Sequence, residues 1–274
     1  MTRLPAEWER QELLLFALPH TNTDWAPYLE EILESYKVLI QTASSFQACL
    51  VLCSDREWAK QWYGESQNVT FVQIQTDDTW IRDFGPIDVM HNQKLIAHDF
   101  IFNAWGDKFG ASKDNLVNQL LYKEDILEGT LKQIDIVLEG GSIESNGEGV
   151  MLSTKACLFN ENRNPHLPHV AIENTLKDLF GLKKIIWLEN GHLEGDDTDA
   201  HIDTLARFID ANTIAYVACD DPSDVHFEPL QKMKEELEST GYNLIALPLP
   251  KAIYFEDSRL PATYANFIFV NEGI

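Results

Sequence analysis

The chain has 274 residues, with 21 Lys and Arg against 44 Asp and Glu, so its formal net charge at pH 7 is −23. Hydrophobic residues make up 45% and aromatic residues 11%, which excludes a disordered chain, since disorder needs high charge with few apolar groups. A charge this negative, without a cluster of Lys and Arg, argues against a surface for nucleic acid or anionic membrane. It suits a small cationic molecule, although an acidic surface can also serve solubility alone.

The sequence has no run of about 18 apolar residues that could span a membrane. Acidic Glu7 and Glu9 follow the first residues, which argues against a signal peptide. The four cysteines are scattered, without a CxxC pair or a disulfide framework. They are Cys49, Cys53, Cys157 and Cys219. We therefore expect a reduced, cytoplasmic protein.

Strand-like apolar runs alternate with amphipathic helical stretches from the N-terminus onward. The spacing of apolar residues predicts, in chain order, a strand over 13–18, a helix over 25–43, a strand over 48–53, a helix over 56–63 and a strand over 69–75.

From residue 69 onward a pattern recurs: a strand runs into a polar loop with a carboxylate, and a hairpin with a short polar turn follows. The strands are predicted over 69–75, 134–138, 185–188, 244–249 and 267–270, and the turns near Asn92, Asn146, Asp210 and Asn271. Helices are predicted over 114–121, 169–180 and 229–240. A spacing of roughly 55–65 residues between turns indicates a repeated unit of strand, hairpin and helix. It is not a parallel βαβ nucleotide-binding unit, and neither GxGxxG nor GxxxxGK[ST] occurs.

The last repeat stops early. The sequence ends at Ile274, directly after polar turn residues, where the earlier repeats continue with a second hairpin strand, a helix and another strand. We expect one domain over 1–274 with a truncated C-terminal module, and a natural protein longer than this chain.

Three polar clusters could carry chemistry: 77–86, 138–144 and 194–204. Each by itself could also be an ordinary polar turn. In the third, His201 and Asp203 are two residues apart, so on an extended segment they would point to the same side. A histidine beside carboxylates suits general acid–base catalysis. Calcium-loop spacing is absent, and the proline between His166 and His169 disfavours a zinc site built from these residues and His201.

Each cluster follows a strand at an equivalent point of the repeat, so the loops should converge on one axis. We therefore expect Asp83, Glu139, His201 and Asp203 to form one site. A site of several carboxylates and one histidine suits a guanidinium, which is planar, always charged and matches carboxylates through forked donors.

Several stretches resemble the agmatine deiminase family, which belongs with bacterial peptidyl-arginine deiminase to the guanidine-modifying pentein superfamily. They occur in family order and span nearly the whole chain. The stretches are LPAEWERQELLLFALPH from Leu4, DDTWIRDFGP from Asp77, NAWGDKFG from Asn103, LEGGSIESNGEG from Leu138, NENRNP from Asn160, GDDTDAHIDTLARF from Gly195 and LPATYANF from Leu260.

The resemblance implies an α/β fold, a five-fold pseudosymmetric propeller of strand–hairpin–helix repeats around a central site. It implies hydrolysis of agmatine to N-carbamoylputrescine and ammonia, a step of putrescine biosynthesis, without a metal or organic cofactor. In the family a cysteine thiolate attacks the guanidinium carbon to form a covalent intermediate, and a histidine protonates the departing ammonia and then activates water.

By motif, Asp83 and Asp203 resemble the carboxylates that bind the guanidinium, and His201 resembles the general acid–base. Glu139 resembles the carboxylate that orients and charges the histidine. Trp80 resembles an aromatic against the substrate's methylene stem, where cation–π attraction adds roughly 0.5–2 kcal/mol, although it could equally pack in the core.

The chain departs from the family pattern in two places. The family's nucleophilic cysteine lies near its C-terminus in a glycine-rich segment, and none of the four cysteines here matches it. We expect that cysteine beyond Ile274, and we expect the 274-residue chain alone to be inactive. Where many members have a Trp-Pro motif, this chain has Leu18-Pro19, which leaves the contacts to the far end of the substrate open.

Two alternatives remain. A deiminase of arginine or peptidyl-arginine would need a cationic or amide contact at the pocket mouth, for which Arg82 and Arg163 are candidates. A non-catalytic pentein would bind a cationic ligand or partner protein. The unpaired strand edge of an open ring favours association, so a homodimer is also expected.

Overall fold

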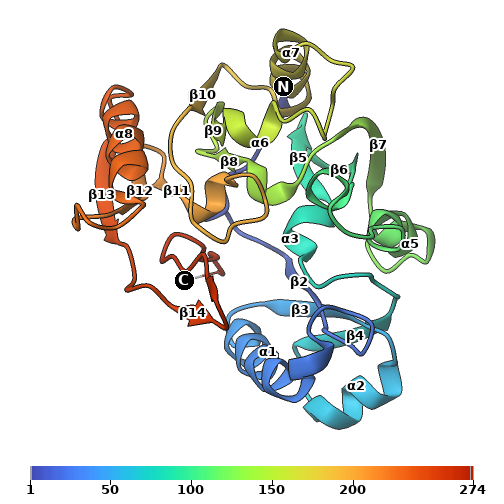
Figure 1. The fold of residues 1–274 in the computed structure, drawn as a ribbon. Coiled ribbons are helices and arrows are strands. Elements are labelled where there is room, and N and C mark those ends of the chain that lie inside the picture. Colours follow the sequence, from blue (N-terminus) through green and yellow to red (C-terminus); the bar gives the residue numbers. More distant parts are fainter. Residues whose placement is uncertain (1, 272, 274) are drawn as a thin grey trace.

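In the computed structural model, which describes residues 2–271 and 273, four sheets of three or four strands surround a centre that loops cross (Figure 1). The main helices lie toward the outside of this arrangement. Within the described part of the chain, no helix is both long and apolar enough to cross a membrane.

The first sheet has three parallel strands in the order β2-β3-β4. They are β2 (Leu13–Ala17), β3 (Ala48–Cys53) and β4 (Val69–Gln73), joined through α1 (Leu29–Ser44) and α2 (Arg56–Tyr63). The bounds of these elements agree with the predicted ones to within two residues, except at the start of α1. There Pro27 lies in a separate 3₁₀ turn, η1 (Ala26–Tyr28), so the α-helix begins at Leu29 rather than at residue 25.

The other three sheets repeat one plan, in which an antiparallel hairpin is followed by a helix and a parallel third strand. The first comprises β5 (Ile87–His91), β6 (Lys94–Ile101), α5 (Val117–Lys123) and β7 (Thr130–Val137), with β1 (Thr2–Arg3) added at its edge. The second comprises β8 (Glu144–Ser145), β9 (Val150–Thr154), α7 (His169–Phe180) and β10 (Lys184–Leu188). The third comprises β11 (Ala206–Asp210), β12 (Thr213–Ala218), α8 (Phe227–Glu238) and β13 (Asn243–Pro248). The predicted repeat of hairpin, helix and strand is confirmed in all three.

Short elements occupy the loops between these units. Three of them lie at the centre and pack in series, α3 against η3 and η3 against η4. The short elements are α3 (Ile81–Phe84), α4 (Ala104–Asp107), η2 (Asp114–Leu116), η3 (Gly140–Ser142), α6 (Lys155–Leu158), η4 (Ile202–Thr204), β14 (Tyr254–Phe255) and β15 (Ser258–Arg259).

The strand predicted over 267–270 is wrong. Side chains, rather than a neighbouring strand, bond its backbone: Glu7 accepts the N–H of Phe269, and Gln11 donates to the carbonyl of Phe269. An isolated bridge joins Val270 to Gly273. The predicted turn at 271–273 includes Glu272, which lies outside the described residues.

Hydrophobic clusters extend across neighbouring units, as where Leu152 of β9 and Ile186 of β10 pack with residues of the next sheet. One joins β11, β12 and α8 through Phe208, Ile214, Leu230 and Met233. Another packs α7 onto β9 and β10. Because these clusters bury the apolar side chains of the sheets and the outer helices, the loops at the centre are free to carry polar groups.

Candidate active site

The predicted residues Asp83, His201 and Asp203 come together around one glycine at the centre of the fold. Gly141, in η3, has no Cβ; a Cβ built there would lie 2.7 Å from Asp83 Oδ1, from His201 Nδ1 and from Asp203 Oδ2. All three polar side chains are buried, with 2–8% of their surface exposed. The three loops therefore point their polar atoms at a single spot above Gly141.

Both carboxylate oxygens of Asp83 are fixed by hydrogen bonds. The backbone N–H of Gly141 donates to Oδ1 at 2.8 Å, and the indole N–H of Trp105 donates to Oδ2 at 3.0 Å. Left-handed backbone presents this indole, since φ is 51° at Ala104, 57° at Trp105 and 90° at Gly106. Such strain in residues other than glycine is characteristic of functional sites. Sequence reasoning noted the motif around Trp105 but gave it no role.

Glu139 is fully buried and pairs with Arg163. The Nε–H of Arg163 donates to both oxygens of Glu139, at 2.9 and 3.0 Å. The same guanidinium donates to Asp199 Oδ2 at 2.7 Å and to the carbonyl of Thr198 at 2.9 Å. Arg163 is only 3% exposed, so it joins the loops beneath the site, and it is not the pocket-mouth contact for which it was a candidate.

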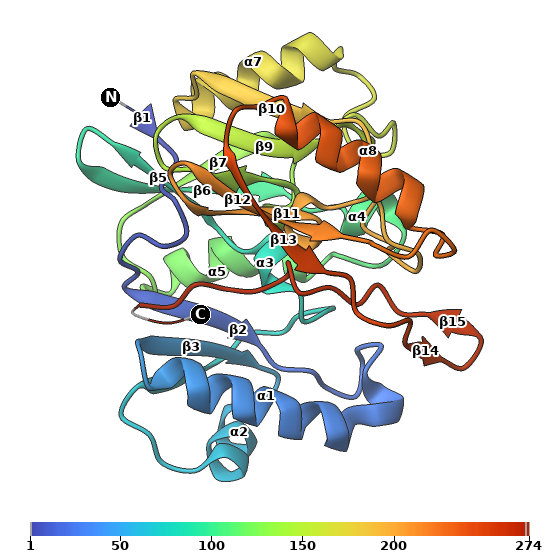
Figure 2. The same cartoon turned by 90° about the vertical axis from the view of Figure 1, so that its left-hand side faces the viewer.

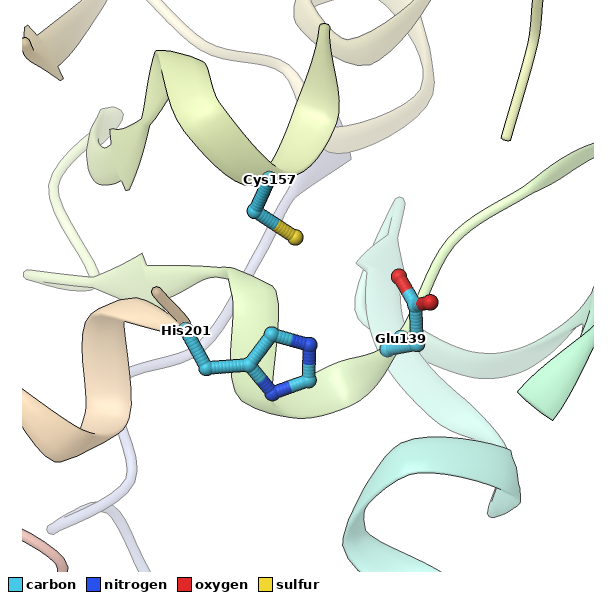
Figure 3. Close-up of side chains that lie close together, drawn as sticks. All are labelled: Glu139, Cys157 and His201. Atoms are coloured by element: carbon cyan, nitrogen blue, oxygen red, sulfur yellow. The ribbon is translucent and has the colours of Figure 1, made fainter. Parts of the chain in front are cut away.

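His201 presents its two ring nitrogens to different surroundings. Nδ1 lies 3.6 Å from Asp83 Oδ1, whereas Nε2 points toward Cys157 and Glu139 (Figure 3). Nε2 is buried and has no hydrogen-bond partner among the described residues. The extended segment expected here is wrong, since Asp203 lies in the 3₁₀ turn η4 that starts after His201. The three loops bring His201 and Asp203 together despite that turn.

The electrostatics favour the imidazolium form of His201. Burial lowers its pKa, but the Asp83 carboxylate, Cys157 and the Asp203 carboxylate raise it, and the balance leaves the pKa well above the usual value. The pKa of Asp203 is raised as well, because burial raises it more than the nearby His201 lowers it. The site therefore holds a proton at its centre.

Replacing Asp83 with asparagine should lower the pKa of His201. The charged form then loses the attraction that contributes most to raising this pKa, while burial continues to oppose it. Because the pKa is raised in the folded state, the stabilising contribution of His201 is complete below its ordinary pKa of about 6.5 and is lost as pH rises through the folded pKa. The D83N variant should lose that contribution at lower pH, which NMR titration of the His201 ring and unfolding at several pH values would measure. An unchanged His201 titration would contradict this account.

Glu139, Cys157 and His201 form a group whose ligand atoms all lie within 4.8 Å of one another, close enough for a metal ion. Arg163 nevertheless donates to both oxygens of Glu139, so its fixed positive charge disfavours a metal cation at this place. His166 and His169, the other candidates for a zinc site, do not belong to this group.

A cavity of about 940 Å³ opens above these residues. Asp83, His201 and Asp203 are among the residues that line it. Trp80, half exposed, lies on its wall 6.3 Å from Trp25, measured between ring centroids. Further aromatic and acidic side chains surround them, namely Tyr28, Trp105, Phe109, Phe255, Asp24, Glu31, Asp78, Asp196 and Asp197.

Positive charge is scarce in this cavity. Among the described residues that line it, Arg82 is the one Lys or Arg, and its Nη1 lies 3.5 Å from Glu7 Oε2. The cavity thus offers carboxylates and aromatic faces, the surroundings that suit an organic cation.

No cysteine lines the cavity within the described part of the chain. All four cysteines are buried, and burial raises the pKa of each thiol, to about 11 for Cys49 and Cys53. A raised pKa leaves little thiolate for nucleophilic attack. Cys157 lies beside His201, a placement that sequence reasoning missed because the two residues are far apart in the chain.

The family model of the Porphyromonas-type peptidyl-arginine deiminases matches residues 3–274. An agmatine deiminase of Pseudomonas aeruginosa is 30% identical over 304 residues, which cover 99% of this chain and 82% of that protein.

Solved structures give the same result. A C. jejuni agmatine deiminase, a cysteine-to-serine variant with substrate bound, is 55% identical with a TM-score of 0.96, and the match covers 99% of this chain and 81% of that one. An agmatine deiminase of Enterococcus faecalis is 26% identical with a TM-score of 0.87 and is covered to 81%. The chain has the α/β pentein fold, and it belongs to the Porphyromonas-type peptidyl-arginine deiminase family.

Proposed function

We propose that the protein is an agmatine deiminase, which hydrolyses agmatine to N-carbamoylputrescine and ammonia. The observation that carries this proposal is the convergence of Asp83, His201 and Asp203 on Gly141 beside an acidic, aromatic-walled cavity. A guanidinium laid over Gly141 would donate to the two carboxylates, and the glycine leaves room for the planar group. The names of the similar proteins from P. aeruginosa and C. jejuni support the choice of agmatine.

In this proposal Asp83 and Asp203 hold the guanidinium, and Trp80 packs on the methylene stem. A cysteine thiolate forms a bond to the guanidinium carbon, and the carbon–nitrogen bond breaks as His201 gives its proton from Nδ1 to the leaving ammonia. Water, deprotonated by the same nitrogen, then adds to the carbon, and the carbon–sulfur bond breaks to release the ureido product. Glu139, held by Arg163, supplies negative charge behind the histidine.

The cysteine of this mechanism is none of the four in the chain, since all are buried and none lines the cavity among the described residues. We therefore propose that the 274-residue chain by itself gives no turnover. We further infer that the three hairpin–helix–strand units and the parallel sheet are modules of a five-fold propeller. The cytoplasmic location and the homodimer stay predictions.

A deiminase of arginine or peptidyl-arginine is the second candidate, favoured by Arg82 on the cavity wall. Its weakness is that the other candidate, Arg163, is buried under Glu139 and cannot reach a substrate carboxylate. The many carboxylates of the cavity would also repel that group. The third reading, a pentein that only binds a cation, would leave the proton-holding site around His201 without a purpose.

Ammonia release from agmatine, with arginine in a parallel reaction, tests the proposal. A form of the protein that carries the family's nucleophilic cysteine should release ammonia from agmatine, and the same form with His201→Ala should release none because the leaving group receives no proton. The 274-residue chain should be inactive in the same assay. Faster release from arginine than from agmatine would support the second candidate, and binding of agmatine without release would support the third.

A further inference from the structure

One wall of the cavity is a segment over 250–264 that contains the β14–β15 hairpin. Phe255, Leu260 and Pro261 from this segment line the cavity, and Phe255 meets the ring of Tyr28 edge-on at 5.2 Å between centroids. In Figure 2 the hairpin extends away from the sheets on the same side as the start of α1. Hydrogen bonds between its own two strands involve two residue pairs, too few to hold it in place.

A partly buried ion pair anchors the base of this hairpin. Arg259 of β15 donates to both oxygens of Asp224, at 3.1 and 2.9 Å, and its side chain is 8% exposed. The arginine in turn holds the pKa of Asp224 well below its usual range. The space under the hairpin is closely filled, since the cavity lined by Arg259, Leu260 and Pro261 is only about 10 Å³.

The same carboxylate leads to the loop that carries His201. His226 Nδ1 lies 2.7 Å from Asp224 Oδ1, and its Nε2 accepts the backbone N–H of Glu194 at 2.7 Å. Because Nε2 accepts a hydrogen bond, Nδ1 carries the ring proton and donates it to Asp224. The ring therefore links Asp224 to the backbone of Glu194. Next to it, Gly195 has φ of 85°, and a Cβ on this glycine would lie 2.1 Å from the carbonyl oxygen of Arg259, so the loop and the hairpin touch directly.

The loop after Gly195 is itself stiff. Asp196 accepts hydrogen bonds from the backbone N–H groups of Thr198 and Ala200, at 3.0 and 2.7 Å. His201 follows at once. The cavity wall and the base of the site are thus tied to one carboxylate, Asp224.

We propose that Asp224, Arg259 and His226 form a clasp that positions the 250–264 hairpin over the cavity and so sets the affinity for the alkyl part of the substrate. None of the three acts on the guanidinium; they act through Phe255 and Leu260. This inference rests on the proposed function, and it assigns the three residues to substrate selection rather than to the chemical step.

Hydrogen exchange and steady-state kinetics together test the clasp, both on a form that carries the family's nucleophilic cysteine. In the Arg259→Ala variant, the amide of Leu260, which donates to the carbonyl of Ile253 at 2.8 Å, should exchange faster than in the unchanged protein. KM for agmatine should rise about tenfold while kcat changes less than twofold, because ground-state and transition-state binding weaken equally. Arg259→Lys keeps the charge but loses the bidentate contact with Asp224. Its exchange rate and its KM should therefore lie between those of the unchanged protein and those of Arg259→Ala.

Lys232→Ala is the matched control, since it removes an exposed ion pair with Glu228 on the neighbouring helix α8. It should leave both measurements unchanged. Unaltered exchange at Leu260 in Arg259→Ala, or faster exchange with an unaltered KM, would overturn the clasp, as would a loss confined to kcat. Absence of turnover in the form that carries the nucleophilic cysteine would contradict the proposed function instead, and hydrogen exchange would then decide the clasp alone.

Discussion

Replacing Gly141 with alanine is expected to abolish most activity while the fold persists. The added methyl group would lie 2.7 Å from Asp83 Oδ1, His201 Nδ1 and Asp203 Oδ2, a distance at which the polar atoms must move apart. Displacement of a reacting group by about 1 Å costs roughly a hundredfold in rate, so kcat/KM should fall at least that far. Ammonia release from agmatine, measured in the form that carries the nucleophilic cysteine, gives the loss.

Gly110→Ala is the appropriate control for this substitution. Nothing lies within 4 Å of a Cβ at Gly110, and its φ is not in the left-handed region, so the variant should keep its activity. The cost of Gly141→Ala in unfolding free energy should be modest, about 1–3 kcal/mol for overpacking. Activity within tenfold of the unchanged protein would show that the guanidinium does not lie over Gly141.

Replacing Arg163 with methionine is expected to destabilise the fold more than any surface change. Glu139 would remain fully buried without its partner, and Asp199 and the carbonyl of Thr198 would each lose a hydrogen bond. Breaking a buried ion pair by removing one member costs about 3–5 kcal/mol. Denaturant unfolding at neutral pH measures this directly.

Two further variants separate the stranded charge from the lost packing. Adding Glu139→Gln to Arg163→Met removes the unpaired carboxylate, so the double variant should recover part of the lost unfolding free energy. Lys155→Met breaks a pair with Glu189 in which both side chains are about half exposed, and it should cost about 0–1 kcal/mol. Equal losses of unfolding free energy for Arg163→Met and Lys155→Met would contradict the stabilising role assigned to the buried Arg163.

Much of the fold follows from local sequence. The hairpin turn at Asn92 and Gln93 has φ of 50° and 67°, the left-handed pair that joins two strands of normal twist, and polar turn residues signalled it. The helix predicted over 169–180 has those bounds, because its apolar residues Ile172, Leu176 and Phe180 recur on one face and are buried. Regular elements of this kind depend on neighbours in the chain, so a single sequence determines them.

The convergence of Asp83, His201 and Asp203 was also within reach of the sequence, because equivalent loops of a repeat meet at one axis. The sequence did not indicate which residues hold these polar side chains in place. Trp105 reaches Asp83 from 22 positions away, and Arg163 reaches Glu139 from 24. Neither residue differs locally from an ordinary core tryptophan or surface arginine, so no local pattern announces the contact.

The sequence by itself thus determined the family resemblance, the repeated units and the carboxylates and histidine of the site. The tertiary structure decided which group each of these side chains meets: Arg163 for Glu139, Trp105 for Asp83, Cys157 and Glu139 behind His201, and the Asp224 clasp beneath the hairpin. It also showed that side chains bond the backbone at 267–270, where the pattern predicted a strand. The physical reason is that helix and strand periodicity arise from backbone geometry over a few residues, whereas hydrogen bonds between loops depend on where separate units pack against one another.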